Sequence, residues 1–322
     1  MAVIWIPRAL ALVLLLSSRS NVSGEGSWCY DRAECGPSTW STREYCNGKR
    51  QSPIDIQSGK AVRNSRLEAI TLTGYDDNKK LLEAKNTGKT VDFELGEGLR
   101  LSGRGLPAPY AAKSFHLHWG NGDSKPGSEH YIDNRRYSME LHIVHTKNNM
   151  SMSDALKDPE GIAVLGFFIE GSRMAREKTA EAWEALTKNL KKVSEKGKDV
   201  HLDSSISLLD LLGSPDLTRY YRYPGSLTTP NCNEVVIWTI FPDPILVPPK
   251  VVAAFPSELY STDSSSGPHL ENNFRPLQPI GARKVEASAS MRAPRSAASL
   301  VSPSKPFLLF LFVTTLRPFF PE

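Results

Sequence analysis

His116 and His118 lie one residue apart in the segment SFHLHWG, in a chain that has only seven histidines. Successive side chains of a β-strand point to opposite faces, so in a strand these two imidazoles would share one face. The other face would carry Phe115, Leu117 and Trp119. Two imidazoles on one face can bind the same metal ion. An H-x-H pair alone is a weak signal, however, because strand histidines often only satisfy hydrogen bonds.

A second β-like run, MELHIVH, supplies a third histidine. Strand alternation places Glu140, His142 and Val144 on one face of this run. It places Leu141, Ile143 and His145 on the other face. About twenty residues separate the two runs, which is enough for them to lie side by side. We therefore expect His142 to join the first two histidines.

Three neutral imidazoles favour Zn²⁺ and leave a fourth coordination position open. A structural zinc site would need a fourth protein ligand, so the pattern favours a catalytic zinc. A ligating histidine usually donates its second N–H to an oriented acceptor, and Glu140 lies on the same face as His142. Glu140 is therefore the candidate for that acceptor.

The 322 residues are 40% hydrophobic and 23% charged, which is typical of a globular protein. Short β-branched or aromatic runs separated by Gly, Pro, Asn and Asp fill most of residues 50–280, so we expect a mainly β (α+β) fold. Helical spacing of apolar residues appears in 175–193, with shorter pieces near 205–212 and 251–259. We expect one domain over residues 24–285, followed by a linker and anchor propeptide over 286–322.

Both ends of the chain are hydrophobic. Residues 1–20 contain an apolar run too short to span a bilayer, which predicts a signal peptide cut no later than residue 23. The second run, 307–316, follows small residues and a polar spacer, as in the signal for a glycosylphosphatidylinositol (GPI) anchor, with Ser288 and Ser296 as attachment candidates. We expect the chain at the extracellular face of the plasma membrane. The alternative is a secreted protein with a frayed tail.

Loss of these segments would turn the formal charge of +4 slightly negative, so nucleic acid is not an expected partner. The four cysteines, in a chain bound for an oxidising compartment, predict two disulfides, and spacing leaves three connectivities open. They are Cys29, Cys35, Cys46 and Cys232. Asn21 and Asn149 begin N-glycosylation sequons.

Six segments of the chain resemble the α-class carbonic anhydrases and run in that family's order. They are QSPIDI (51–56), FHLHWG (115–120), GSEH (127–130), MELHIVH (139–145), YPGSLTTP (223–230) and NNFRPLQP (272–279). Within the family, the likeness is strongest to the membrane-bound type IV enzymes and the related type XV. That resemblance implies disulfides Cys29–Cys35 and Cys46–Cys232, and it favours Ser288 over Ser296 as the anchor site.

The resemblance implies a large, mostly antiparallel twisted central sheet with peripheral helices, and zinc at the bottom of a conical cleft. Its motifs make His116, His118 and His142 the zinc ligands. They also make Thr228 the residue that orients the attacking hydroxide, with Glu129 accepting a hydrogen bond from Thr228. The implied pocket for carbon dioxide consists of Val144, Val164, Leu227, Thr229, Val236 and Trp238. His130 and His145 match buried structural positions of the family.

The implied reaction is reversible hydration of carbon dioxide to bicarbonate and a proton. Lys89 stands where the family's fast enzymes have a proton-shuttle histidine, and a lysine pKa near 10.4 is poorly matched to proton relay at neutral pH. We therefore expect proton transfer to limit turnover, and neither His201 nor His269 offers a substitute from sequence. Ser114 and Asp92 also depart from the family pattern in the polar half of the cleft.

The implied partners are carbon dioxide, bicarbonate and, through a lipid anchor, a membrane. The resemblance also implies a monomer located near bicarbonate transporters. One rival interpretation is a non-catalytic, carbonic-anhydrase-like binding module at the cell surface, which the retention of all three histidines disfavours. Another is a secreted zinc hydrolase, but the sequence has neither an H-E-x-x-H motif nor a G-x-S-x-G motif.

Overall fold

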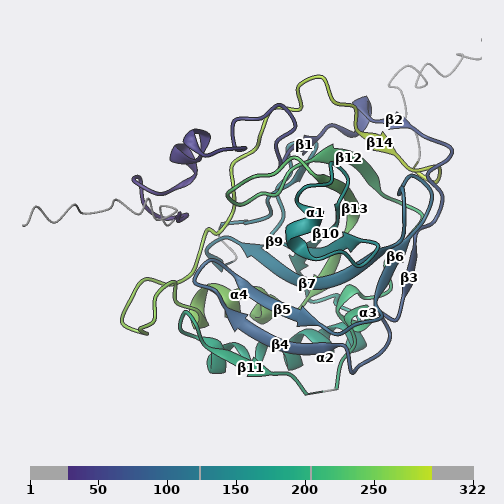
Figure 1. Ribbon diagram of the computed structural model, residues 1–322. Coiled ribbons are helices and arrows are strands. Elements are labelled where there is room, and N and C mark those ends of the chain that lie inside the picture. The colour runs from purple at the N-terminus through teal and green to yellow at the C-terminus, as the bar shows by residue number, and fades with distance from the viewer. Residues whose placement is uncertain (1–27, 123–124, 204, 292–322) are drawn as a thin grey trace, which may run out of the picture. The chain divides into compact units, whose positions relative to one another are not determined.

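Two neighbouring strands, β7 (Tyr110–Trp119) and β9 (Met139–Lys147), carry the histidine runs near the middle of a large twisted sheet (Figure 1). The computed structural model describes residues 28–122, 125–203 and 205–291, all within one compact unit. In this part of the chain the sheet has twelve strands, in the order β11-β4-β5-β7-β9-β10-β13-β12-β14-β2, with β3 and β6 attached beside β7.

The sheet is mixed, but only β10 with β13 and β14 with β2 pair in parallel among the strands described. The remaining pairs in the sheet are antiparallel. A separate parallel pair is formed by β1 and β8. The other strands are β1 (Asp55–Ile56), β2 (Val62–Arg63), β3 (Thr71–Thr73), β4 (Leu81–Asn86), β5 (Val91–Leu95), β6 (Arg100–Ser102), β8 (Tyr131–Ile132), β10 (Ile162–Gly171), β11 (Asp199–His201), β12 (Tyr221–Gly225), β13 (Val236–Val247) and β14 (Glu286–Ala287).

The helices are few and short. The three predicted helical regions correspond to α2 (Glu177–Thr187) with the following η4 (Leu190–Val193), to α3 (Leu208–Leu212) and to α4 (Pro249–Glu258). The sequence did not predict α1 (Met152–Ala155), η1 (Pro37–Thr42) or η2 (Ser58–Lys60), which are one or two turns long and have no room for a periodic pattern. Ser207 and Asp210 form a capping box on α3, and Gly213, at a φ of 68°, ends that helix.

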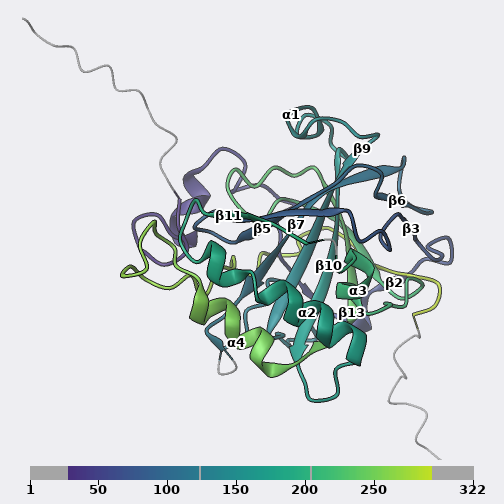
Figure 2. The same cartoon turned by 90° about the horizontal axis from the view of Figure 1, so that it is seen from below.

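One face of the sheet carries the main hydrophobic core, and α2 and α4 lie over it (Figure 2). The predicted alternation is confirmed there, because Phe115, Leu117 and Trp119 are all buried in this core. The Trp119 ring lies 5.2 Å from the ring of Phe255 on α4. The opposite face therefore remains for the side chains of His116 and His118.

Two disulfides hold the N-terminal segment. Cys29 bonds to Cys35 and Cys46 to Cys232, which is the pairing that the resemblance implied. The second bond ties residue 46 to the loop after β12, and Trp40 is fully buried against it. Among the described residues, no helix has the length and apolar character needed to cross a membrane. The predicted signal peptide and the apolar run 307–316 lie outside those residues.

His145 lies on the helix-covered face of β9 and is completely buried. Its Nδ1 donates to the carbonyl oxygen of Ala163 at 3.1 Å, and its Nε2 contacts the hydroxyl of Tyr75. Burial lowers the pKa of the His145 imidazole to about 4. The ring is therefore neutral in the folded protein at pH 7.

The depressed pKa of His145 predicts a stability that depends on pH. As the pH falls, His145 in the unfolded chain, with an ordinary pKa near 6.5, is protonated before His145 in the folded protein. The contribution of the neutral ring to the free energy of unfolding is therefore fully present above about pH 6.5. It is lost as the pH falls to the folded-state value of about 4, at a cost of about 3 kcal/mol. Urea unfolding of the zinc-loaded wild type and of His145→Gln should show a stability difference that shrinks over this window. A difference independent of pH would contradict the assignment.

Candidate metal centre

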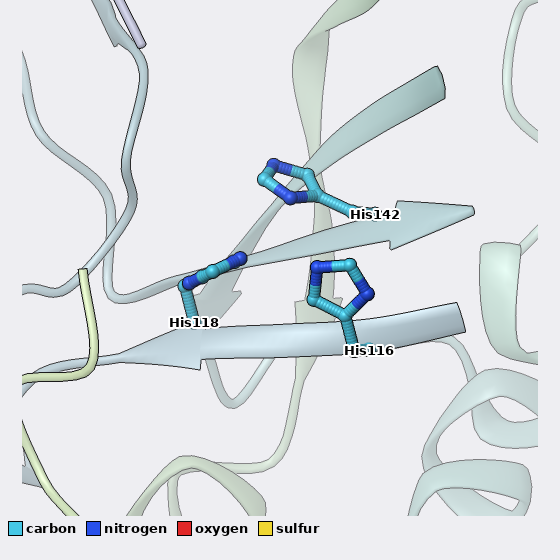
Figure 3. Close-up of side chains that lie close together, drawn as sticks. All are labelled: His116, His118 and His142. Atoms are coloured by element: carbon cyan, nitrogen blue, oxygen red, sulfur yellow. The ribbon is translucent and has the colours of Figure 1, made fainter. Parts of the chain in front are cut away.

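The rings of His116, His118 and His142 converge on the open face of the sheet (Figure 3). In the antiparallel register His116 is directly opposite His142, and their ring centroids are 5.3 Å apart. The His118 centroid lies 5.1 Å from that of His116 and 4.6 Å from that of His142. Each ring offers a nitrogen within 4.8 Å of the others, so the predicted three-histidine cluster is present.

Hydrogen bonds determine which nitrogens face the cluster. Nδ1–H of His118 donates to the carbonyl oxygen of Asn273 at 2.7 Å, which leaves Nε2 with a lone pair. Nε2–H of His142 donates to the Glu140 carboxylate at 2.7 Å, which leaves Nδ1 of this ring with a lone pair. Burial lowers the pKa of His118 to about 3, and burial and the neighbouring histidines hold the pKa of His116 well below its usual range. These two rings are therefore neutral at pH 7.

Glu140 is completely buried and accepts four hydrogen bonds. Oε1 accepts from Nε2 of His142 and from Nδ1 of His130, both at 2.7 Å. Oε2 accepts from the backbone N–H groups of Glu129 at 2.8 Å and of His130 at 2.7 Å. Burial alone would raise the pKa of this carboxyl, but His130 and His142 hold it well below its usual range. Glu140 is therefore an ionised acceptor that fixes the orientation of His142.

Glu129 is also completely buried but is only half satisfied. Its Oε1 accepts from the backbone N–H of Arg275 at 2.8 Å. Its Oε2 has no hydrogen-bond partner among the described residues, and lies 3.3 Å from Nε2 of His118 and 3.9 Å from Nδ1 of His142. Burial raises the pKa of the Glu129 carboxyl to about 7, although nearby His142 and the Thr228 hydroxyl lower it.

The donor set fits a zinc ion. Nε2 of His118 is a buried nitrogen without a hydrogen-bond partner in the described part of the chain, and an unpaired polar atom is costly to bury. A metal ion would supply the missing partner and would bind the other two imidazoles as well. The cluster has three nitrogen donors rather than four, which suits zinc with an open position. A second group of possible donors, His130, Glu140 and His142, is instead joined by the hydrogen bonds described above.

An apolar wall adjoins the cluster. Val144 on β9, Val164 on β10 and Trp238 on β13 lie at paired positions of three adjacent strands. These residues and Val236 are buried in one hydrophobic cluster, against which Leu227 packs. The Trp238 ring lies 4.8 Å from that of His142. Thr229 is half-buried, and its carbonyl oxygen accepts from the N–H of Cys232.

Gly166 keeps a narrow space behind His142. It is paired with His142 across β9 and β10, and a Cβ atom there would lie 2.6 Å from Ile240 and 3.2 Å from Oε1 of Glu140. Any larger side chain would displace the side chain of Ile240 and crowd the Glu140 carboxylate. Glycine at this position thus allows Glu140 to approach both of its histidine donors.

Lys89 lies in the turn between β4 and β5 and is half-buried. Its Nζ is 5.2 Å from the ring centroid of Trp28, a cation–π contact. Burial and the nearby Lys196 lower the pKa of the ammonium. Its carbonyl oxygen accepts from the side-chain amide of Asn273 at 3.0 Å.

The other two departures from the family pattern lie beside the first histidine. Asp92 is paired with His116 across β5 and β7, and Ser114 is two residues before His116. Burial raises the pKa of Asp92, an effect that hydrogen bonding to the Ser114 hydroxyl reduces. A carboxyl group therefore stands at a register position next to the cluster.

Sequence reasoning assigned no role to Asn273, although it lies in the segment NNFRPLQP. Its carbonyl oxygen accepts from His118, and its side-chain oxygen accepts from the backbone N–H of Trp119 at 2.8 Å. Its amide donates to the carbonyl oxygens of Lys89 and Leu117. Tyr223 was missed as well, and its hydroxyl contacts Nε2 of His130 at 2.6 Å.

The remaining predicted sites divide between exposed, buried and undescribed positions. Asn149 is exposed in a turn, and Lys113 donates to its side-chain oxygen. Ser288 is completely buried, and its hydroxyl donates to the carbonyl oxygen of Thr218 at 2.7 Å. Asn21 and Ser296 lie outside the described residues.

Comparison with known proteins identifies one family over most of the chain. The profile of the eukaryotic-type carbonic anhydrases matches residues 35–289. Carbonic anhydrase 4 of Mus musculus is 38% identical over 92% of this chain and 94% of its own length. Carbonic anhydrase 15 of the same species is 35% identical over 90% of this chain and 92% of its own length. Carbonic anhydrase 12 of Homo sapiens is 34% identical over 90% of this chain and 82% of its own length.

Proposed function

We propose, from the premise that the chain belongs to the eukaryotic-type carbonic anhydrase family, that His116, His118 and His142 bind the zinc ion of this enzyme. The family consists of zinc enzymes, and the chain is a lyase that interconverts carbon dioxide with bicarbonate and a proton. The observation that carries the assignment of ligands is the buried, unpartnered Nε2 of His118 beside two further imidazoles.

The roles of the surrounding side chains follow from their hydrogen bonds. When bound, zinc supplies a nucleophile at neutral pH by lowering the pKa of water. Glu140 holds the His142 ring with Nδ1 toward the cluster, and Asn273 holds the His118 ring with Nε2 toward it. We assign Thr228 to orient the nucleophile and Glu129 to accept the Thr228 hydroxyl proton in a hydrogen bond. The proximity that lowers the pKa of Glu129 supports this pairing.

Carbon dioxide would bind against the apolar wall of Val144, Val164, Leu227, Val236 and Trp238. The wall excludes water from one side of the histidine cluster, so a small apolar substrate gains contact area without displacing polar groups. Thr229, which is half-buried and follows Leu227 by two residues, completes the proposed pocket.

Each hydration turnover releases a proton that must leave the site. Lys89 contacts Trp28, and burial and Lys196 lower its pKa, but an ordinary lysine pKa near 10.4 is poorly matched to accepting a proton at neutral pH. We therefore propose that proton transfer limits kcat and that an added buffer base relieves this limit.

Stopped-flow hydration at pH 7 with increasing imidazole tests both the function and its limit. Wild type with full zinc content should show a kcat that rises with imidazole while kcat/KM stays constant. Lys89→His should raise kcat roughly tenfold at a low buffer concentration, since the ordinary pKa of a histidine is close to the pH of the assay. Lys250→Gln, which changes an exposed lysine on α4, is the control. No hydration at any imidazole concentration by zinc-loaded protein would favour the non-catalytic binding module.

Glu140→Gln should weaken zinc binding by about 10- to 100-fold. The amide can accept through only one of its two positions, so four donors can no longer be satisfied. Competition with a chelator measures the affinity. Glu83→Gln on β4 is the matched control, because Glu83 makes none of these hydrogen bonds. Equal affinities for the wild type and Glu140→Gln would contradict the proposed orientation of His142.

We propose that the chain is secreted and held at the extracellular membrane surface by a GPI anchor, as a monomer near bicarbonate transporters. The two disulfides support an oxidising compartment, and the apolar ends support a signal peptide and an anchor signal. The exposed Asn149 is available for glycosylation. At Ser288 the anchor would join the main-chain carboxyl, so burial of its hydroxyl does not oppose attachment there.

Cell-surface release tests the anchor. Phospholipase C specific for phosphatidylinositol should release the full-length protein from expressing cells, because the anchor would be its attachment to the membrane. A chain ended after Met291 should appear in the medium without the enzyme. Full-length protein that is found in the medium without phospholipase would instead indicate a secreted tail.

A further inference from the structure

A cavity of about 300 Å³ lies beside the turn that follows β9 and is called the turn pocket below. Three parts of the chain line it: the connection from Leu95 at the end of β5 to Arg100 at the start of β6, the start of β7 from Ala111 to Lys113, and Asn149 in the turn. Its volume is at the lower end of the range for small-molecule sites. The turn pocket is therefore of a size for one small ligand.

The turn pocket has an apolar base and a polar rim. Leu95, Leu99 and Ala112 line it and are buried. Glu97 and Arg100 line it as exposed side chains, and neither forms an ion pair within the described part of the chain. A guanidinium donates hydrogen bonds and a carboxylate accepts them, so the rim offers both functions to a ligand. A rim with charges of both signs selects no ion of either sign, whereas a neutral sugar can use both kinds of group.

Asn149 is both a wall of the turn pocket and the first residue of the sequon Asn149-Met150-Ser151. It is exposed, and positive φ values at Asn148 (48°) and Asn149 (60°) turn the chain sharply there. Nζ of Lys113 donates to Oδ1 of Asn149 at 2.6 Å. This contact orients the amide and leaves Nδ2, the atom that carries an N-linked sugar, without a hydrogen-bond partner among the described residues. A sugar on Nδ2 would therefore start at the wall of the turn pocket.

We infer that the turn pocket binds the first N-acetylglucosamine of an N-glycan on Asn149. The C–H face of the sugar ring would lie on the apolar base, and its hydroxyl and acetamido groups would form hydrogen bonds with Glu97 and Arg100. The sugar would thus join the β5–β6 connection to the turn after β9 and stabilise both. The covalent bond already restricts the position of the sugar, so its binding costs little further entropy.

Attachment of the sugar balances as a group transfer. A bond forms between Nδ2 of Asn149 and the anomeric carbon, and Nδ2 loses one proton. The carbon–oxygen bond to the diphosphate of a lipid-linked sugar donor breaks, and the diphosphate keeps the electron pair. The inference rests on the proposed glycosylation of Asn149 and is independent of the zinc chemistry.

The test is a thermodynamic cycle between the sugar and the rim of the pocket. Full-length, zinc-loaded protein is purified from cells that make only high-mannose glycans, and endoglycosidase H trims each glycan to one N-acetylglucosamine. The same treatment of Asn149→Gln gives the form without a sugar at this position. The Tm of the wild type should lie roughly 2 °C above that of Asn149→Gln. Arg100→Ala or Glu97→Ala should remove most of this difference. Arg66→Ala, which removes an exposed arginine outside the pocket, should preserve it.

Mass spectrometry of the trimmed protein establishes whether Asn149 carries the sugar, and hydrogen exchange adds a second readout. The sugar should slow exchange of the backbone N–H groups from Gly96 to Arg100 relative to Asn149→Gln. An equal Tm difference in the Arg100→Ala and Arg66→Ala backgrounds, or no difference in wild type, would overturn the inference while leaving the glycosylation in place. An unmodified Asn149 would overturn both. The proposed hydration of carbon dioxide is measured separately and stands or falls apart from either result.

Discussion

The buried carboxylate of Glu140 is the interaction on which the candidate site depends. An ionised group without solvent is costly unless every lone pair is used, and Glu140 meets this demand with four donors. Two of these donors are backbone N–H groups in the loop before β9, and two are imidazoles. The same charge therefore positions the loop with Glu129 and fixes the tautomer of His142, and its Oε1 would lie 3.2 Å from a Cβ atom at position 166.

Strand alternation made the centre of the fold predictable from sequence. His116, His118 and His142 are placed by a period of two, a local property that survives in any sheet whose one face is buried. The same alternation places Phe115 and Leu117 on the face that packs in the main hydrophobic core, opposite the histidines. The long helix could be predicted as well, since Trp183 and Leu186 recur at helical spacing and are buried against the sheet.

Contacts between distant segments could not be predicted in this way. Asn273 is 155 residues from His118, and no local pattern states which carbonyl oxygen accepts a given ring N–H. Cys46 and Cys232 are 186 residues apart, so only a resemblance could select their pairing. The contact of Lys89 with Trp28 likewise depends on how the N-terminal loop folds back. Local sequence thus predicts which face a residue occupies, and tertiary structure determines its partners.

Strand β14 lies between β12 and β2, near the end of the described chain. Under the proposed anchor, mechanical force from the membrane would enter the protein through this strand. The hydrogen bonds of β14 to both of its neighbours would oppose that force. The buried Ser288, bonded to Thr218 and Tyr220, would resist the same displacement. The membrane tether would therefore pull on a strand that is hydrogen-bonded on both sides near the edge of the sheet. The histidines on β7 and β9 lie several strands away from it.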